Sequence, residues 1–199
     1  GDPIFLVLLG WEKAFDKIDQ QQMLEAIRRM NVPETTIQEI AKIYESPKFK
    51  IKDSQGISSE RKQQTGIRQG CPLSPYLFVI ALDSVFQLIW DEIAAERPLK
   101  PPKGLDTDIF ALLYADDTLL ITGDAPSMER LLHKVERISF AFGLSLNKKK
   151  CLLVKSNTKQ TIKFRAGSPV KETTDVEYLG TLLNNKLRSE EHTSELQSH

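Results

Sequence analysis

The sequence predicts an α+β fold in which helices cover one face of an antiparallel sheet, and two observations support this prediction. The run Ile4 to Leu9 is continuously apolar and has the length of a strand that is buried on both faces. From Ile4 to Val154 the patterns follow the order strand, helices, strand, strand, helix, strand, if a small polar hairpin is counted as an insertion. This is the split βαβ order of a ferredoxin-like sheet.

The helices are predicted from capping residues and from apolar residues at helical spacing. Asp19 can cap the first helix, and Pro33 to Thr35 opens the second. Ser74-Pro75 starts a long third helix, which ends before a proline-rich loop. The fourth helix runs from about Ser127 to Phe142 and is ended by Gly143.

The remaining strands are predicted between these helices. Lys48 to Lys52 and Glu60 to Gln64 flank a glycine-containing turn and indicate the polar hairpin. Ile109 to Leu113 and Thr118 to Thr122 indicate a second hairpin, and Cys151 to Val154 indicates the last strand. In a ferredoxin-like sheet the first strand lies beside this second hairpin, so the end of the first strand is expected next to the hairpin turn.

Composition restricts the class of protein. The 199 residues include 27 Lys plus Arg and 27 Asp plus Glu, and the resulting net charge of zero neither demands nor excludes a nucleic-acid partner. Cys71 and Cys151 build no disulfide framework and no four-ligand zinc site, which fits a reduced intracellular setting. No apolar run is long enough to cross a bilayer, and no signal peptide is evident.

The two ends of the chain suggest an interrupted reading frame. Residues 188–199 resemble the translation of a common sequencing-library adapter, and we expect them to be a non-native tail; a polar natural tail is the alternative. The natural domain then spans residues 1–187 and has a net charge of +2. Because a core strand follows Gly1 almost at once, we also expect that the frame was cut at its start.

Asp116 and Asp117 are the strongest candidates for a chemical role. Two adjacent carboxylates within an apolar hairpin rarely serve folding, and with an aspartate at position 10 three carboxylates would converge, whose repulsion only cations would relieve. Such oxygen ligands suit Mg²⁺, and two ions about 3.5 to 4 Å apart can clamp the attacking and leaving oxygens of a phosphoryl transfer. Aspartate is also common in turns, which is the structural alternative for this dipeptide. The predicted topology places Gly10 opposite the pair.

Five motifs occur in an order that resembles the reverse transcriptase palm of non-LTR (LINE-type) retrotransposons. They are Leu8 to Asp16, Gly66 to Pro75, Tyr114 to Asp117, Gly143 to Lys150 and Tyr178 to Gly180. The resemblance covers roughly Ile4 to Leu187. It implies an RNA-directed DNA polymerase with a ferredoxin-like palm, two Mg²⁺ ions, an RNA template, a DNA primer and deoxynucleoside triphosphates.

The resemblance implies that Asp116 and Asp117 are catalytic metal ligands, and that the backbone carbonyl of Trp11 is a further ligand. The backbone amides near Lys13 and Ala14 would meet the triphosphate. Phe15 would lie under the incoming sugar and select deoxynucleotides; a plain core aromatic is the alternative.

Three further segments receive roles from the same resemblance. Gln69 and Gly70 would pack on the incoming nucleotide beside Arg68 as a phosphate contact, unless they form an ordinary turn. Lys150 would protonate the departing pyrophosphate, but Lys148 to Lys150 could equally be a solvated run or a phosphate-backbone patch. Leu179 and Gly180 would belong to the hairpin that grips the primer end, with a plain edge strand as the alternative.

The chain departs from the family at position 10. Family members carry a metal-bridging aspartate where this sequence has Gly10, which supplies no side-chain ligand. Glu12 and Asp16 are not expected to substitute, since Glu12 lies beyond the strand end and Asp16 matches a separate family position. Losing one preorganised electrostatic group commonly costs on the order of 10² to 10³ in rate, so we predict a nearly or fully inactive protein. Fingers, thumb and any endonuclease are expected outside residues 1–187.

Other functional classes stay open at this stage. The same element order occurs in RNA-binding modules, although neither Ile4 to Leu9 nor Cys151 to Val154 supplies an exposed aromatic platform. An inactive scaffold that holds an RNA/DNA hybrid, a decayed element and a misread codon at position 10 are alternatives. Phe15 argues against an RNA-templated RNA polymerase. An intracellular protein of the nucleus or cytoplasm, not bound to a membrane, is expected, and the sequence leaves its oligomeric state undetermined.

Overall fold

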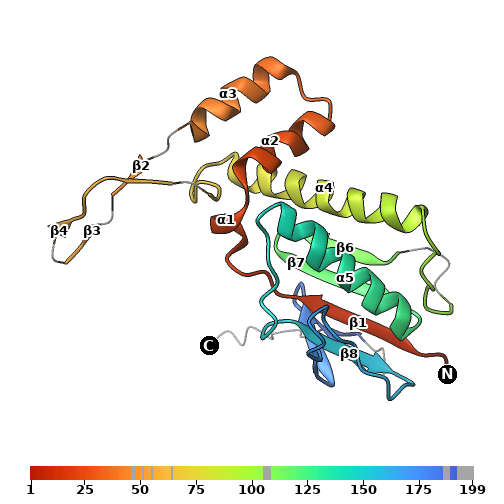
Figure 1. Cartoon of the computed structure of the whole chain (residues 1–199). Coiled ribbons are helices and arrows are strands. Elements are labelled where there is room, and N and C mark those ends of the chain that lie inside the picture. Colours follow the sequence, from red (N-terminus) through yellow and green to blue (C-terminus); the bar gives the residue numbers. More distant parts are fainter. Residues whose placement is uncertain are drawn as a thin grey trace. The chain divides into compact units, whose positions relative to one another are not determined.

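The computed structural model describes residues 1–45, 48–50, 52–54, 56–63, 65–104, 109–185 and 189–191 (Figure 1). The chain divides into two compact units. The first comprises Gly1–Trp11, Ile89–Arg137 and Leu146–His199, and the second comprises Glu12–Leu88 and Ile138–Ser145. Two long helices, α4 (Ser74–Ala94) and α5 (Ala125–Ala141), have residues in both units.

A five-stranded sheet of order β6-β7-β1-β8-β9 forms the centre of the first unit. Its strands, in that order, are Ala111–Tyr114, Asp117–Thr122, Ile4–Leu9, Leu152–Ser156 and Lys171–Glu172. β1 pairs antiparallel with both β7 and β8, which confirms that the first strand lies beside the second hairpin. The expectation of a purely antiparallel sheet is wrong, because β9 runs parallel to β8. Residues 157–170 provide the connection of about a dozen residues that parallel pairing requires.

Apolar residues of this sheet are buried on both faces, as the continuous apolar run of β1 predicts. Phe5 and Val7 are fully buried on one face. On the other face Leu6 belongs to a core cluster with Leu119, Val154, Val176 and Tyr178. The last two lie on β10 (Asp175–Tyr178), which forms a hairpin with β11 (Thr181–Asn184). This hairpin therefore covers one face of the sheet, which a prediction of helices alone did not anticipate.

The second unit contains α1 (Ala14–Lys17), α2 (Gln20–Arg29) and α3 (Glu34–Tyr44). The backbone N–H of Gln22 donates to Asp19 Oδ1 at 2.8 Å, which confirms the predicted cap of α2. The short helix α1 was not predicted. The polar hairpin is present as two short ladders: β2 (Lys48–Phe49) with β5 (Arg61–Lys62), and β3 (Lys52–Asp53) with β4 (Gly56–Ile57).

Several predicted boundaries shift by a few residues. α5 begins at Ala125 and not at Ser127, because Asp124 Oδ1 accepts a hydrogen bond from the Ser127 N–H and caps the helix earlier. Gly143 follows the end of α5 with φ 75°, as predicted. In the expected non-native tail, Ser189–Glu191 forms β12 and pairs with β11; the other tail residues lie outside the described part. Among the described residues, no helix has the length and apolarity that crossing a membrane requires.

Candidate functional site

Asp116 and Asp117 lie at the turn between β6 and β7. Tyr114 pairs with Asp117, so Ala115 and Asp116 alone form the turn. Ala115 has φ 51°, a left-handed conformation that costs a non-glycine residue roughly 1–2 kcal/mol. Both carboxylates are exposed, and in the described part of the chain neither has a hydrogen-bond or ion-pair partner. The fold thus places two unneutralised carboxylates on a strained turn.

Two other segments of the first unit end beside this turn. Leu9 pairs with Thr118, so Gly10 and Asp117 adjoin one residue beyond the ladder, as expected. Tyr178, from the hairpin on the sheet face, has its pKa raised first by burial and second by the negative charge of Asp117. Tyr178 belongs to a predicted motif but was not among the predicted site residues.

The space for a side chain at position 10 is already filled. A Cβ on Gly10 would lie 2.4 Å from the Cβ of Lys150, an atom that can move only with its backbone. The Gly10 N–H donates to Cys151 Sγ at 3.4 Å, and its carbonyl accepts from the Asn147 N–H at 2.7 Å. The predicted nucleotide contact Lys150 therefore packs where the family's aspartate would begin, and an aspartate here requires the backbone to shift.

Cys151 is a buried structural residue beside Gly10. Its side chain is fully buried, and burial raises the pKa of the thiol above its ordinary value. A buried, protonated thiol is a poor nucleophile. The hydrogen bond from the Gly10 N–H therefore serves to hold the end of β1 against the start of β8.

Trp11 is anchored at the same end of the sheet. Its side chain is 7% exposed, and Nε1 donates to Thr118 Oγ1 at 3.2 Å. Its backbone forms an isolated bridge with Leu146. These contacts fix the residue whose carbonyl the resemblance assigns to a metal ion; that role stays a prediction.

The predicted nucleotide-contacting residues Lys13, Ala14 and Phe15 lie in the second unit. Lys13 is left-handed, with φ 49° and ψ 49°, and its carbonyl accepts from the N–H groups of Asp16 and Lys17. Phe15 is half-buried and stacks on Phe78, with ring centroids 4.5 Å apart. The ring thus contacts the core and remains partly exposed, so the structure is compatible with both interpretations of Phe15.

The loop that contains Arg68, Gln69 and Gly70 docks on this segment. The Gly66 N–H donates to the Ile18 carbonyl at 2.8 Å, and Gln69 Nε2 donates to Asp16 Oδ1 at 2.9 Å. A Cβ on Gly66 would approach the Asp16 carbonyl oxygen to 2.6 Å, so the close approach needs a glycine. Gly70 faces open space, with no atom within 4 Å of a Cβ placed there, and Arg68 is exposed. The second unit therefore brings the two predicted nucleotide-contacting segments together.

Leu179 and Gly180 form the two-residue turn between β10 and β11. Both have positive φ, 51° and 76°, as the favoured hairpin turn requires. Leu179 is 50% exposed. The predicted hairpin is confirmed over the alternative of a plain edge strand, and its contact with a primer stays a prediction.

The donor set is incomplete for a protein-only metal site. In the ranges that the structure describes, no group of three or more His, Cys, Asp or Glu gathers closely enough to hold a metal ion. Glu12 pairs with Lys17 at 3.8 Å, and Asp16 accepts from Gln69, so each has a protein partner. Asp116 and Asp117 alone fit Mg²⁺ in the mode in which one or two carboxylates, water and substrate phosphates share the ion.

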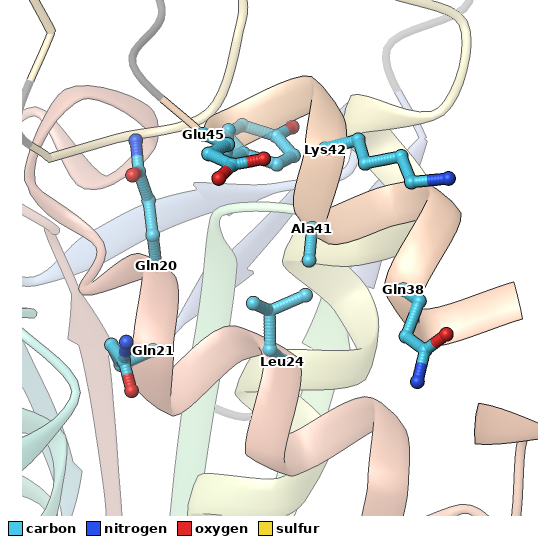
Figure 2. A pocket seen from close by; sticks show the side chains of 8 residues that line it. Gln20, Gln21, Leu24, Gln38, Ala41, Lys42 and Glu45 are labelled. Carbon is cyan, nitrogen blue, oxygen red and sulfur yellow. The ribbon is translucent and has the colours of Figure 1, made fainter. Parts of the chain in front are cut away.

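A hollow of about 390 Å³ lies elsewhere in the second unit (Figure 2). It is lined by residues of α2 and α3 and by Glu45, which follows α3. The helical lining residues are Gln20, Gln21, Leu24, Gln38, Ala41, Lys42 and Tyr44. It contains none of the predicted site residues.

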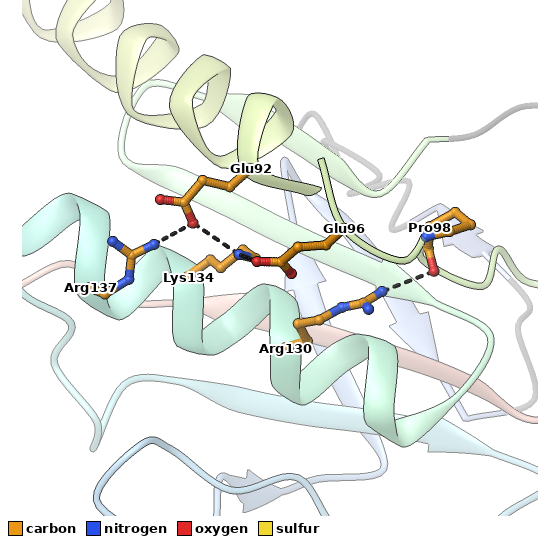
Figure 3. Close-up of polar contacts among 6 residues, drawn as sticks. All are labelled: Glu92, Glu96, Pro98, Arg130, Lys134 and Arg137. Atoms are coloured by element: carbon orange, nitrogen blue, oxygen red, sulfur yellow. Dashed lines mark hydrogen bonds and ion pairs between the residues drawn. The ribbon is translucent and has the colours of Figure 1, made fainter. Parts of the chain in front are cut away.

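A second charged group, within the first unit, links α5 to the last turn of α4 and to Glu96 just beyond it (Figure 3). Lys134, whose side chain is 10% exposed, donates to Glu92 at 2.9 Å and to Glu96 at 2.7 Å, and Arg137 also binds Glu92. Hydrogen bonds from Arg137 and Lys134 lower the pKa of Glu92. Burial alone would lower the pKa of Lys134, but the hydrogen bonds to Glu96 and Glu92 raise it overall. No sequence motif indicated this network.

Comparison with known proteins identifies the family. The family described as reverse transcriptase (RNA-dependent DNA polymerase) matches residues 4–183. The chain is 27% identical over 173 residues to a Pol polyprotein of the retrotransposable element R2 of Nasonia vitripennis, covering 83% of this chain and 16% of that protein. It is 27% identical over 150 residues to the R2DM polyprotein of Drosophila melanogaster, covering 75% and 14%. The chain thus spans about a sixth of these relatives or less.

Solved structures share the fold. Apo telomerase of Candida tropicalis, truncated from its C-terminal domain, superposes with a TM-score of 0.70 at 13% identity, covering 96% of this chain and 36% of that one. Candida albicans telomerase, in complex with a telomeric RNA fragment, gives a TM-score of 0.68 at 15% identity, covering 96% and 30%. These similarities show an α+β polymerase-like fold. On the family match and the R2 relatives, the chain belongs to the reverse transcriptase family, as a domain of the non-LTR retrotransposon type.

Proposed function

We propose that this chain is the palm fragment of an RNA-directed DNA polymerase, with a ferredoxin-like core, and that Gly10 leaves it inactive or nearly so. The observation that carries the proposal is the pair of exposed, unpartnered carboxylates on the strained turn beside Gly10. In the intact relative, a primer 3′-hydroxyl attacks a deoxynucleoside triphosphate on an RNA template.

Asp116 and Asp117 would hold divalent cations together with the Trp11 carbonyl. Two bound Mg²⁺ ions would supply charge neutralisation at the attacking and leaving oxygens. Lys150, beside Gly10, would donate a proton to the pyrophosphate. Leu179 and Gly180, at the hairpin tip, would contact the primer end.

The second unit would contribute nucleotide contacts. The backbone amides near Lys13 and Ala14, with Arg68, would meet phosphate oxygens, while Gln69 and Gly70 would pack on the nucleotide. The open space in front of Gly70 supports a close approach of a ligand to the backbone. The partly exposed ring of Phe15, held by Phe78, supports a rigid surface against the sugar.

The proposed site lacks one group that catalysis would need, a third carboxylate at position 10. With Gly10, no third carboxylate joins the pair, and the filled space at position 10 supports a settled arrangement without one. We therefore propose an alternative of a different class, an inactive scaffold that still holds an RNA/DNA hybrid, or a decayed copy of the element. Residues 188–199 are proposed to be non-native, and the domain to act in the nucleus or cytoplasm.

A complete enzyme rebuilt around residues 1–187, with fingers and thumb from an R2-type relative, tests the proposal. Gly10→Asp should speed primer extension by on the order of 10²-fold or more. Gly10→Ala is the matched control, since it adds the Cβ near Lys150 without a carboxylate, and it should not speed extension. Equal rates with Gly10 and with Gly10→Asp would contradict the assignment of position 10.

A further inference from the structure

The charge of this neutral chain is strongly segregated. Residues 148–171 contain eight Lys or Arg and no Asp or Glu, so the rest of the chain carries a net charge of −8. The whole segment belongs to the first unit, where it comprises the residues before β8, all of β8, the connection to β9 and the first residue of β9. A basic stretch of this density inside a neutral protein indicates a polyanionic partner.

The structure gathers most of these cations at one end of β8. Lys171 pairs with Leu152, so it lies close to Lys149 and Lys150. Lys148 sits over the Phe164 ring, 5.0 Å from its centroid, which brings the connection back to the same turn. Phe164 is buried while its neighbours Lys163 and Arg165 are exposed, so these two side chains point away from the core. We call Lys149, Lys150, Lys163, Arg165 and Lys171 the basic cluster.

The acidic groups nearby are engaged by other partners. Glu129 accepts the backbone N–H of Lys163, and Glu136 accepts the backbone N–H of Arg165 and pairs with Lys148 at 3.8 Å. Glu172 pairs with Lys155. In the described part of the chain, no cation of the basic cluster has an ion pair. Five exposed cations without carboxylate partners therefore remain for an external anion.

The position of the basic cluster favours nucleic acid over other polyanions. Lys150 adjoins Gly10 at the end of β1, and Asp117 adjoins Gly10 from the opposite side. Since neighbouring strands lie about 4.8 Å apart, the cluster begins roughly 10 Å from the aspartate pair, at the same end of the sheet. A nucleic-acid strand positioned at the aspartates would carry its phosphates onto this surface.

We propose that the basic cluster binds the phosphate backbone of the nucleic acid that the aspartate pair would process, and so extends the proposed site along the β8–β9 edge of the sheet. The choice of nucleic acid rests on the proposed function. The cluster acts through charge, without base contacts, so binding depends on salt and not on sequence.

The test measures binding by the full chain without catalysis. Fluorescence anisotropy with a labelled RNA/DNA hybrid, and with single-stranded RNA of the same sequence, gives the affinity from about 50 to 200 mM salt. The quadruple variant Lys149→Gln, Lys163→Gln, Arg165→Gln, Lys171→Gln leaves the proposed catalytic Lys150 intact. The matched control, Arg97→Gln, Lys100→Gln, Lys103→Gln, Lys159→Gln, removes four exposed cations of the same unit that lie outside the basic cluster.

We expect the cluster variant to lower the slope of log affinity against log salt by about 3, and to weaken binding more than about tenfold at 100 mM salt. The control should change affinity by about twofold or less because its charges are screened at a distance. Circular dichroism melting checks that both variants remain folded. Equal losses in both variants, or no loss in either, would overturn the inference.

Two further outcomes separate this inference from the proposed function. Polyglutamate that competes with the hybrid at equal charge concentration would overturn nucleic acid as the partner. Primer extension by the rebuilt enzyme tests the polymerase assignment separately. The binding assay is independent of that result, because it requires neither Asp116 nor a carboxylate at position 10. A rebuilt enzyme that extends primers, combined with an unchanged salt slope in the cluster variant, would leave the function standing and reject the cluster.

Discussion

Two pairs of carboxylates in the first unit have opposite surroundings. Glu92 and Glu96 are held by Lys134, and Arg137 adds a second cation to Glu92 (Figure 3). Asp116 and Asp117 have no cation among the described residues. The protein thus neutralises these acidic groups where α4 and α5 pack, and leaves the aspartate pair unneutralised at one turn of the sheet. Carboxylates of the first kind stabilise the fold, and those of the second kind are available to an external cation.

The difference follows from local structure. Glu92 lies in the last turn of α4 and Glu96 lies two residues beyond its end, while Arg130, Lys134 and Arg137 lie along one face of α5. Facing stripes of opposite charge can pair without strain. Asp116 lies in the two-residue turn, and Asp117 begins β7 opposite Tyr114, so in the described part of the chain neither carboxylate faces a cationic side chain.

The largest expected effect is on the rate of primer extension, which should depend on the aspartate pair and not on Glu92 and Glu96. In the rebuilt enzyme that carries Gly10→Asp, Asp116→Asn should reduce primer extension by on the order of 10²-fold or more, because an electrostatic group at the reacting centre is lost. Glu92→Gln, a matched loss of one carboxylate charge, should leave the rate within about twofold. Comparable losses in both variants would contradict the assignment of separate roles to the two carboxylate pairs.

The next largest effect is on the free energy of unfolding, which should depend on the glutamate network and not on the aspartate pair. Lys134→Met should lower the free energy of unfolding by about 1 to 3 kcal/mol, since two charge-assisted hydrogen bonds to a largely buried ammonium are removed. Asp116→Asn with Asp117→Asn should leave stability unchanged or slightly higher, because like charges lose their repulsion. Urea unfolding of the full chain measures both. A destabilised aspartate variant would show that the turn depends on these carboxylates for folding.

The smallest effect is a dependence on pH. The pKa of Glu92 is lowered in the folded state, so its contribution is present above its ordinary value of about 4.3 and is lost as pH falls through the folded value. The stability difference between the wild-type chain and Lys134→Met should therefore shrink between about pH 5 and pH 3. A difference that stays constant over this range would mean that Lys134 acts through packing alone.

Sequence patterns predicted the secondary structure and the neighbours of the first strand. The apolar run of β1, the Asp19 cap and Gly143 are local features, and each produced the expected element. The parallel strand β9 and the packing of the β10–β11 hairpin over the sheet face escaped prediction, because they depend on how a long connection returns to the sheet and not on local periodicity.

The candidate site was predictable only through ordered motifs. Asp116 and Asp117 were indicated by their chemistry, and the motifs indicated the other candidate residues of each unit. Tyr178 was matched within a motif and Cys151 within a strand, but neither was predicted as a neighbour of the site, because burial of a tyrosine or a cysteine is typical of ordinary core positions. Lys150 fills the space beside Gly10 although the two residues are 140 positions apart in the sequence. Local periodicity cannot predict a contact between residues so far apart.

The most direct test of the central claim is divalent-cation binding at the aspartate turn. Mn²⁺ binding, followed by electron paramagnetic resonance in place of Mg²⁺, would be measured for the full chain and for Gly10→Asp and Gly10→Ala. If Asp116 and Asp117 form a cation site that lacks a third carboxylate, Gly10→Asp should bind about tenfold or more tightly than Gly10→Ala. Equal Mn²⁺ affinity in the two variants would show that position 10 does not face the carboxylate pair, and would contradict the account.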